Sequence, residues 1–228
     1  MHVFYLHGFA SSSQSSKAAF FGAKLSEHGV TLNAPDFNDP DFSTLTITRM
    51  IEQTLASISA LAPGPVALIG SSLGAFVAVQ VALRRSRAED RLVLLAPALD
   101  FGGNRMRALG DRGLDAWQET NRLDVFHYGF GRVMPIHYEL YADARRYNSL
   151  EARPDVPIQI FQGRRDTAVD PATVEAWAAA RPNVELHMLD DDHQLGGSLD
   201  YLWREIKRFI FLGADVPSPT PGVAQTRP

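Results

Sequence analysis

The sequence predicts a single α/β domain built on a mainly parallel β-sheet with helices on both faces. Short apolar runs alternate with longer segments of helical period, which is the pattern of stacked βαβ units. Most of the short runs are apolar throughout, as expected for strands that helices cover on both sides. A length of 228 residues, with 45% hydrophobic and 21% charged residues, suits one globular domain with a sizeable core.

Six runs have the length and composition of strands. They lie at residues 2–6, 30–34, 66–69, 92–96, 158–161 and 184–189. Helices are expected between them, at residues 16–28, 43–62, 73–85, 171–180 and 198–211. Local signals agree with these ends: Gly29 follows the first helix, and Asp170 with Pro171 forms an N-cap and first-turn pair.

The alternation fails once, between residues 100 and 153, where some fifty residues separate two strands that one helix could connect. Residues 100–153 are therefore expected to form a helical cap or lid inserted into a domain that spans residues 1–212. Aromatic residues are concentrated there, and we expect them either to line a substrate pocket or to form only the insertion's own small core. The pocket candidates are Trp117, Phe126, Phe130, Tyr138 and Tyr141. Residues 213–228 are rich in Pro and are expected to be a disordered tail.

Composition excludes several classes of function. The formal net charge is −4, so no overall basic field attracts nucleic acid or an anionic membrane. The chain has no Cys, which excludes disulfides, thiolate metal sites and thiol nucleophiles. No basic leader and no apolar run of about 18 residues is present, so the sequence predicts a cytoplasmic protein without a membrane partner.

The most informative motif is Gly70-Ser71-Ser72-Leu73-Gly74, a G-x-S-x-G between a predicted strand and a predicted helix. A sharp strand-to-helix turn of this kind, a nucleophile elbow, strains its middle residue and lifts that side chain clear of both elements. Small residues two positions before and after let strand and helix approach closely. Ser72 is therefore the candidate nucleophile, and the alternative is a Gly/Ser-rich turn that binds phosphate or nothing.

A serine nucleophile needs a base, and a base needs an acid that orients it. On an α/β sheet the chain order is Ser, then Asp or Glu, then His, which favours His193, just past the last predicted strand. Asp166 follows the preceding strand and is the candidate acid, whereas Asp170 is expected to cap a helix. His193 could instead be an exposed loop residue, and Asp166 could pair with a neighbouring Arg. A metal site on the acidic run 190–192 needs an unusually shaped loop.

Ester chemistry also needs two N–H donors for the oxyanion. The first is expected from Leu73, the residue after the nucleophile, and the second from the loop after the first strand. That loop begins His7-Gly8-Phe9-Ala10, so Phe9 is the candidate donor and Ala10 the alternative. His7 is interpreted as a structural loop residue.

With these motifs in place, the chain resembles the α/β-hydrolase superfamily. The run from Leu6 to Ala18, LHGFASSSQSSKA, together with the elbow, is similar to small bacterial esterases of the YqiA type. Ala10, Ser13 and Ala75 depart from the residues typical of that type. The resemblance implies an α/β-hydrolase fold whose six strands lie in the order 2-1-3-4-5-6.

The resulting prediction is a serine hydrolase that cleaves small-molecule carboxylic esters with a Ser72-Asp166-His193 catalytic triad and no cofactor. His193 would deprotonate Ser72 and later protonate the leaving alcohol. Two alternatives stay open. The same residues can cleave thioesters or amides, and the fold can serve as a non-catalytic binding module.

Overall fold

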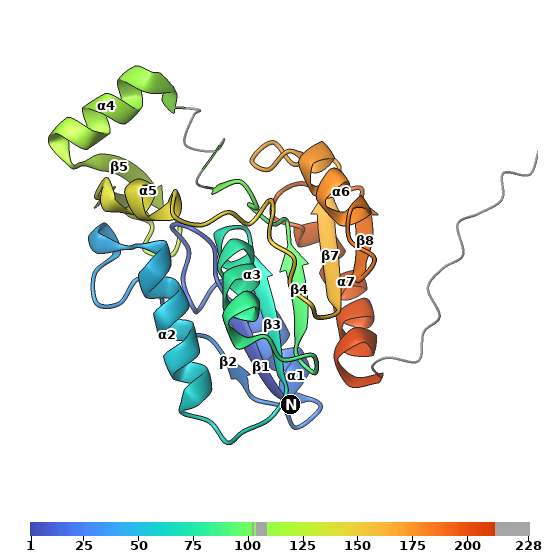
Figure 1. Cartoon of the computed structure of the whole chain (residues 1–228). Coiled ribbons are helices and arrows are strands. Elements are labelled where there is room, and N and C mark those ends of the chain that lie inside the picture. Colours follow the sequence, from blue (N-terminus) through green and yellow to red (C-terminus); the bar gives the residue numbers. More distant parts are fainter. Residues whose placement is uncertain (102, 104–108, 213–228) are drawn as a thin grey trace, which may run out of the picture.

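A six-stranded parallel sheet forms the centre of the structure, a computed structural model that describes residues 1–101, 103 and 109–212 (Figure 1). Its strands are β1 (His2–Leu6), β2 (Leu32–Asn33), β3 (Val66–Ser71), β4 (Arg91–Leu95), β7 (Ile158–Gly163) and β8 (Val184–Leu189). They lie in the order β2-β1-β3-β4-β7-β8, with every neighbouring pair parallel. The predicted fold class and strand order are confirmed. The tail predicted at residues 213–228 lies outside the described residues.

Five helices lie between and after these strands, near their predicted positions. They are α1 (Ser16–Ser26), α2 (Ile47–Ser59), α3 (Leu73–Arg85), α6 (Pro171–Ala179) and α7 (Leu199–Lys207), the last continued by a π-helical turn, Arg208–Leu212. The helix expected from residue 43 begins at Ile47 instead, because Thr46 has an extended backbone and its hydroxyl caps the N–H of Arg49 at 3.2 Å. The residues before it form a 3₁₀ turn, Phe42–Thr44.

Helices cover both faces of the sheet, as Figure 1 shows. Alternate residues of a strand face opposite sides. In β1, Val3 and Tyr5 pack with residues of α1 and α7, while Phe4 and Leu6 pack with residues of α2 and α3. The sheet is therefore buried on both sides, so a site open to solvent is expected at its edges or in the connecting loops.

The insertion between β4 and β7 contains a β-hairpin that the sequence analysis did not predict. Its elements are α4 (Gly110–Thr120), the antiparallel pair β5 (Leu123–His127) and β6 (Arg132–Ile136), and α5 (Glu139–Ala144). The expectation of a purely helical insertion is thus wrong for this part. The hairpin is buried on one face only: His127 and Ile136 are buried, whereas Phe126 and Val133, paired across the strands, are 50% and 60% exposed.

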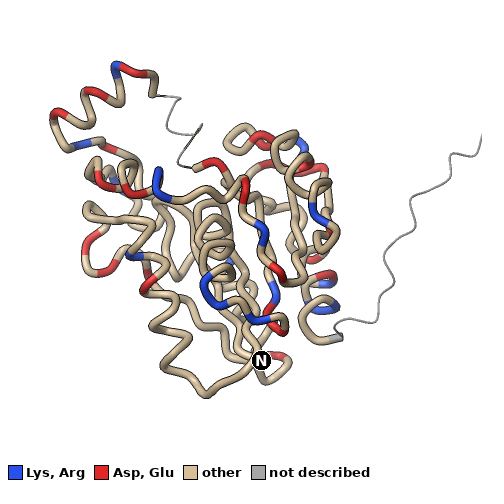
Figure 2. The backbone as a smooth tube through the Cα atoms, viewed as in Figure 1, with Lys and Arg blue, Asp and Glu red and all other residues tan. Residues whose placement is uncertain are grey.

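Charged residues of both signs are interspersed along the backbone in the view of Figure 2. Helix α4 carries Asp111, Arg112, Asp115 and Glu119 at exposed positions. Within the described residues, every helix is too short or too polar to cross a bilayer.

Candidate active site

Ser72 stands at the turn between β3 and α3 in a strained backbone conformation. Its φ is 54° and its ψ is −112°, in the left-handed half of φ space that L-residues rarely adopt. Backbone hydrogen bonds hold the turn: the Ser72 N–H donates to the Leu95 carbonyl at 2.9 Å, and its carbonyl accepts the Ala98 N–H at 3.2 Å. The hydroxyl does not cap α3 and forms no hydrogen bond to a described residue, so it is available at the carboxyl edge of the sheet.

Two glycines of the motif are required by close backbone contacts. A Cβ on Gly74 would lie 2.0 Å from the Leu6 carbonyl oxygen, and one on Gly70 would lie 2.5 Å from the Gly74 oxygen. Both distances are far inside van der Waals contact, so α3 can approach β1 and β3 only with glycine at these positions. The interpretation of the motif as a strand-to-helix turn with small flanking residues is therefore supported by the packing itself.

Asp166 and His193 lie together on the loops that follow β7 and β8. Nδ1 of His193 donates to Oδ2 of Asp166 at 2.8 Å, with the carboxylate side chain fully buried and the imidazole 19% exposed. Nε2 of His193 forms no hydrogen bond to a described residue. An imidazole held through Nδ1 presents a basic Nε2.

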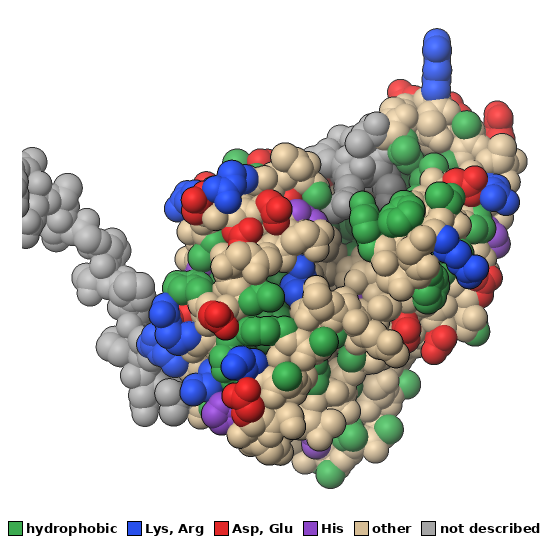
Figure 3. Space-filling model, turned by 180° about the vertical axis from the view of Figure 1, so that it is seen from behind, with side chains coloured by type: hydrophobic (Ala, Val, Ile, Leu, Met, Phe, Trp, Pro, Cys, Tyr) green, Lys and Arg blue, Asp and Glu red, His purple; other side chains and the backbone are tan. Residues whose placement is uncertain are grey.

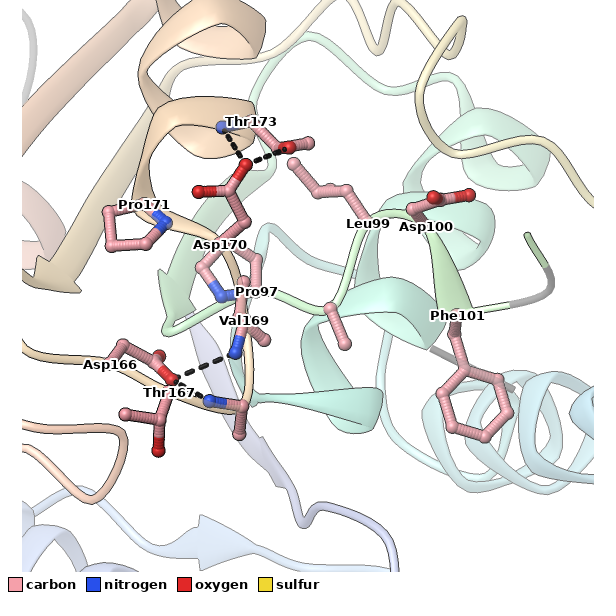
Figure 4. A pocket seen from close by; sticks show the side chains of 12 residues that line it. Pro97, Leu99, Asp100, Phe101, Asp166, Thr167, Val169, Asp170, Pro171 and Thr173 are labelled. Atoms are coloured by element: carbon pink, nitrogen blue, oxygen red, sulfur yellow. Dashed lines mark hydrogen bonds between the residues drawn. The ribbon is translucent and has the colours of Figure 1, made fainter. Parts of the chain in front are cut away.

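Hydrogen bonds satisfy both oxygens of Asp166. Oδ1 accepts the N–H groups of Ala168 and Val169, each at 2.8 Å (Figure 4). Oδ2 accepts a hydrogen bond from Nε2 of Gln162 at 3.0 Å, in addition to the one from the imidazole of His193. Burial raises the pKa of Asp166, but the hydrogen bonds from His193, Val169 and Gln162 lower it by more, so that pKa lies below its usual value. The carboxylate is thus ionised at neutral pH.

Gln162 was missed by the sequence analysis. It is the penultimate residue of β7 and fully buried, its Nε2 donates to Asp166, and its Oε1 has no hydrogen-bond partner among the described residues. A polar residue at the carboxyl end of a predicted strand, four positions before the candidate acid, is the signal that could have identified it.

The loop that carries His193 is fixed by several separate contacts. A Cβ on Gly163 would lie 2.5 Å from the carbonyl oxygens of Asp191 and Asp192, so this glycine lets the loop cross the end of β7. Nζ of Lys17, in α1, donates to the Gln194 carbonyl at 2.6 Å. Lys17 is buried, and this burial lowers its pKa. Its role was not predicted, because the contact spans 177 residues of sequence.

The acidic run beside His193 does not converge on one point. Asp190 pairs with Arg165, Asp191 accepts the Ser198 hydroxyl at 2.8 Å, and Asp192 accepts the Gln194 N–H at 2.8 Å. In the described part of the chain, no three His, Asp or Glu side chains gather as a metal site would require. Asp170 caps α6 as predicted, accepting the N–H groups of Ala172 and Thr173 at 3.1 and 3.2 Å.

The two predicted oxyanion donors lie beside Ser72. Leu73 is the first residue of α3, where an N–H has no partner within the helix. Phe9 follows Gly8, and a Cβ on Gly8 would lie 3.3 Å from Cβ of Ser72, which shows how closely this loop passes the serine. Ala10, the alternative donor, has a φ of 53°. His7 is buried in the same loop, where its Nε2 accepts the Phe37 N–H at 3.0 Å, a structural role as predicted.

A cavity of about 500 Å³ lies next to Asp166, between the loops that follow β4 and β7 (Figure 4). Residues 97–101, 166–171 and Thr173 line it. Of the insertion's aromatic residues only Phe101 takes part. Trp117 is instead buried, its Nε1 donating to the Ile136 carbonyl at 2.9 Å, and its ring packs against Tyr138 and Tyr141.

The other two pocket candidates lie on the surface. Phe126 and Phe130 are 50% and 46% exposed. None of the five aromatic candidates lines this cavity, which includes neither Ser72 nor His193, so their place in a substrate pocket stays a prediction. The alternative, a small core of the insertion itself, describes Trp117, Tyr138 and Tyr141.

Three solved structures are similar to the chain. A candidate hydrolase from Agrobacterium vitis S4 has a TM-score of 0.80 at 24% identity, covering 92% of this chain and 87% of that one. Est1E from Butyrivibrio proteoclasticus, also solved with ferulic acid bound, has 0.76 at 20% identity, with coverages of 92% and 86%. A monoacylglycerol lipase from Paleococcus ferrophilus has 0.72 at 15% identity, with coverages of 91% and 93%.

At these identities the structures show a shared fold. No curated protein matches the chain. A family model described as an uncharacterised protein family, UPF0227, matches residues 2–210, which is nearly all of the described structure. The strand order and the structural neighbours show an α/β-hydrolase fold, and the family match shows that the chain belongs to the UPF0227 family.

Proposed function

We propose that this protein is a serine hydrolase that cleaves carboxylic esters through an acyl-enzyme on Ser72. The observation that carries the proposal is the strained serine at the end of β3, on the same sheet edge as an imidazole whose Nδ1 is held by a buried carboxylate. Strain at a non-glycine residue is costly and is typical of functional turns. A His–Asp pair with a buried carboxylate, on the same sheet edge, is the kind of base that a serine hydroxyl needs.

In the proposed reaction, His193 Nε2 takes the Ser72 proton as Oγ attacks the ester carbonyl carbon. Asp166, ionised and fixed by four hydrogen bonds, holds the imidazole in the required tautomer and stabilises the imidazolium. Collapse of the tetrahedral intermediate breaks the bond to the alkoxy oxygen, which takes the proton from His193. Water then attacks the acyl-enzyme by the same sequence, and Ser72 recovers its proton.

The oxyanion of each tetrahedral intermediate would accept hydrogen bonds from the N–H groups of Leu73 and Phe9. The amino end of α3 adds the positive end of its helix dipole at the same point. These donors belong to the backbone and are held in place before substrate binds. They can therefore stabilise developing charge without reorganisation in the transition state.

Ester chemistry is favoured over the alternatives by two of the structural relatives. Est1E was solved with ferulic acid, a carboxylic acid, and the Paleococcus ferrophilus protein is named a monoacylglycerol lipase. A carboxylic acid is a product of ester cleavage, and a monoacylglycerol carries its acyl group on oxygen. Thioester or amide cleavage by the same residues is the second outcome that a substrate panel distinguishes.

The decisive experiment combines labelling with turnover. A fluorophosphonate probe should label the wild-type protein, and p-nitrophenyl esters of short acyl chains should be hydrolysed. Ser72→Ala should lose both, with turnover reduced about 10⁴-fold or more. Ser71→Ala, at the adjacent buried serine, is the matched control and should keep labelling and most activity.

Undiminished turnover in Ser72→Ala would disprove the mechanism. Absence of labelling and of turnover on ester, acyl-CoA thioester and anilide substrates alike would favour a binding module on the hydrolase fold. Faster turnover of the thioester than of matched esters would move the assignment to a thioesterase.

A further inference from the structure

The hairpin of the insertion touches the loop that carries the proposed oxyanion donor Phe9. The Gly129 N–H, in the β5–β6 turn, donates to the Ala10 carbonyl at 3.4 Å. A Cβ on Gly129 would lie 3.0 Å from Cβ of Ser12 and 3.2 Å from the Ser11 carbonyl carbon. The turn is therefore seated against this loop, residues 9–13, with no room for a side chain between them.

Hydrogen bonds through Asn38 also join the hairpin to loop 9–13. Nε2 of His127, at the end of β5, lies 2.9 Å from Oδ1 of Asn38, and Nδ2 of Asn38 donates to the Ser11 carbonyl at 2.9 Å. Asp36 adds a second tie, because its carboxylate accepts Nδ2 of Asn38 at 2.7 Å and the Ser13 hydroxyl at 3.2 Å. His127 is 0% exposed and Asn38 7% exposed. The hydrogen bond between His127 and Asn38 is thus shielded from competing water, and the others are partly buried.

Aromatic contacts run parallel to these hydrogen bonds. The Phe9 ring packs on Phe42 at a centroid distance of 5.6 Å, and Phe42 meets the His127 ring edge-on at 4.6 Å. On its other side His127 stacks on Phe130 at 4.1 Å. The residue that offers the proposed N–H is therefore connected to the hairpin through its side chain as well as through its backbone.

The hydrogen bonds of His127 specify its neutral form. Nδ1 accepts the Phe130 N–H at 3.1 Å, so the proton must reside on Nε2, which donates to Asn38. Burial lowers the pKa of His127. One imidazole thus closes the hairpin turn through Nδ1 and holds Asn38 through Nε2.

We propose that His127 and Asn38 are positioning residues that hold the Phe9 loop in the shape that binds the oxyanion. The inference rests on the proposed function. It gives the insertion a role in catalysis other than lining the pocket. Loop 9–13 contains Ala10 at a φ of 53°, an unfavourable backbone conformation that persists only where surrounding contacts impose it. The Gly129 and Asn38 contacts, on the carbonyls of Ala10 and Ser11, hold the two peptides that follow Ala10.

The test uses the full chain and four variants beside Ser72→Ala. His127→Leu removes the donor to Asn38, and His127→Gln restores it, because a Gln amide can place an N–H near the position of Nε2. Asn38→Ala removes the hydrogen bond to the Ser11 carbonyl, and it provides the test if His127→Leu does not fold. His137→Leu, at a half-buried histidine of the same insertion, is the matched control.

Two readouts separate positioning from general destabilisation. The first is steady-state hydrolysis of p-nitrophenyl butyrate, resolved into kcat and KM. The second is inhibition by benzyl trifluoromethyl ketone, which adds to a serine hydroxyl and leaves an oxyanion at the carbonyl oxygen. We expect His127→Leu and Asn38→Ala to lower kcat about 10- to 100-fold with KM nearly unchanged, and to weaken the ketone by a similar factor. His127→Gln should recover most of both.

Folded Asn38→Ala or His127→Leu protein with wild-type kcat and ketone affinity would overturn the inference. So would equal losses in His137→Leu. Ser72→Ala distinguishes failure of this inference from failure of the proposed function. If Ser72→Ala is inactive while the His127 and Asn38 variants have normal activity, only the positioning role fails. If Ser72→Ala retains turnover, the proposed function fails and the inference with it.

Discussion

Ser72 affects the stability of the fold through its strained backbone and the proposed reaction through its hydroxyl, so the two effects can be measured separately. A φ of 54° with a ψ of −112° is the mirror image of an ordinary extended conformation, which glycine adopts freely and L-residues do not. Ser72→Gly should therefore raise the free energy of unfolding by about 1 kcal/mol while abolishing ester turnover. Thermal and urea unfolding of Ser72→Gly and Ser72→Ala would check this, with Ser72→Ala expected near the wild type. A lower stability for the glycine variant would mean that the turn is not strained.

Gln162 offers a second test at the scale of one residue. Its amide N–H shares Oδ2 of Asp166 with the imidazole, so Gln162→Leu should leave the carboxylate less firmly oriented and lower kcat about tenfold. Gln159→Leu is the matched control, because Gln159 is also buried in β7 but its amide lies near Glu185 and His187. Comparable activity loss in both variants would assign Gln162 a purely structural role.

The candidate site could be predicted only partly from sequence, for a reason that these residues make clear. Ser72 has a local signal, since the motif, the strand before it and the helix after it are contiguous. Lys17 and His127 have none, because each is defined by a partner brought near by folding. The hydrogen bond from Lys17 to Gln194 and that from His127 to Asn38 span 177 and 89 residues.

At the scale of elements, the packing of α3 against β1 depends on Gly74. A Cβ on Gly74 would lie 2.0 Å from the Leu6 carbonyl oxygen, which is backbone and cannot rotate away. Gly74→Ala should force α3 outward and destabilise the protein by about 3 kcal/mol or more. Gly22→Ala in α1 is the control, because its Cβ would meet only Leu32 Cδ2 at 3.8 Å and alanine favours helix. Urea unfolding should show the first variant well below the wild type and the second at or above it.

The elements also show why the hairpin escaped prediction. Apolar strands of the central sheet are continuous runs, whereas β5 alternates, with Val125 half-buried and Phe126 exposed. Two exposed aromatic residues of the hairpin, Phe126 and Phe130, were among the predicted pocket residues. Figure 3 shows hydrophobic side chains on the surface of the molecule seen from behind. Aromatic composition alone does not distinguish a strand with one exposed face from a pocket lining.

At the scale of the whole molecule, the carboxylates of Asp36 and Asp166 link loops near the proposed site to acid stability. Contact with His7, whose Nε2 lies 3.3 Å from Oδ1 of Asp36, is the largest cause that lowers the pKa of this half-buried carboxyl, to about 2, and the pKa of Asp166 is shifted in the same direction. A carboxyl group whose folded-state pKa lies below its unfolded value stabilises the fold fully above the unfolded pKa. That stabilisation is lost as pH falls from about 4, the unfolded value, through the folded pKa.

The wild-type free energy of unfolding should therefore fall as pH decreases from about 4 toward 2. Asp36→Asn should fall less steeply over the same interval, because an amide does not titrate but can still accept the Asn38 N–H that Oδ1 accepts at 3.0 Å. Asp200→Asn, at an exposed carboxyl in the first turn of α7, is the control and should keep the wild-type slope. Urea unfolding at pH 6, 4 and 3 measures the slopes. Parallel curves for the wild type and Asp36→Asn would show that this carboxylate has the same pKa in the folded and unfolded chains, and that the ties between loop 9–13 and Asp36 do not stabilise the fold.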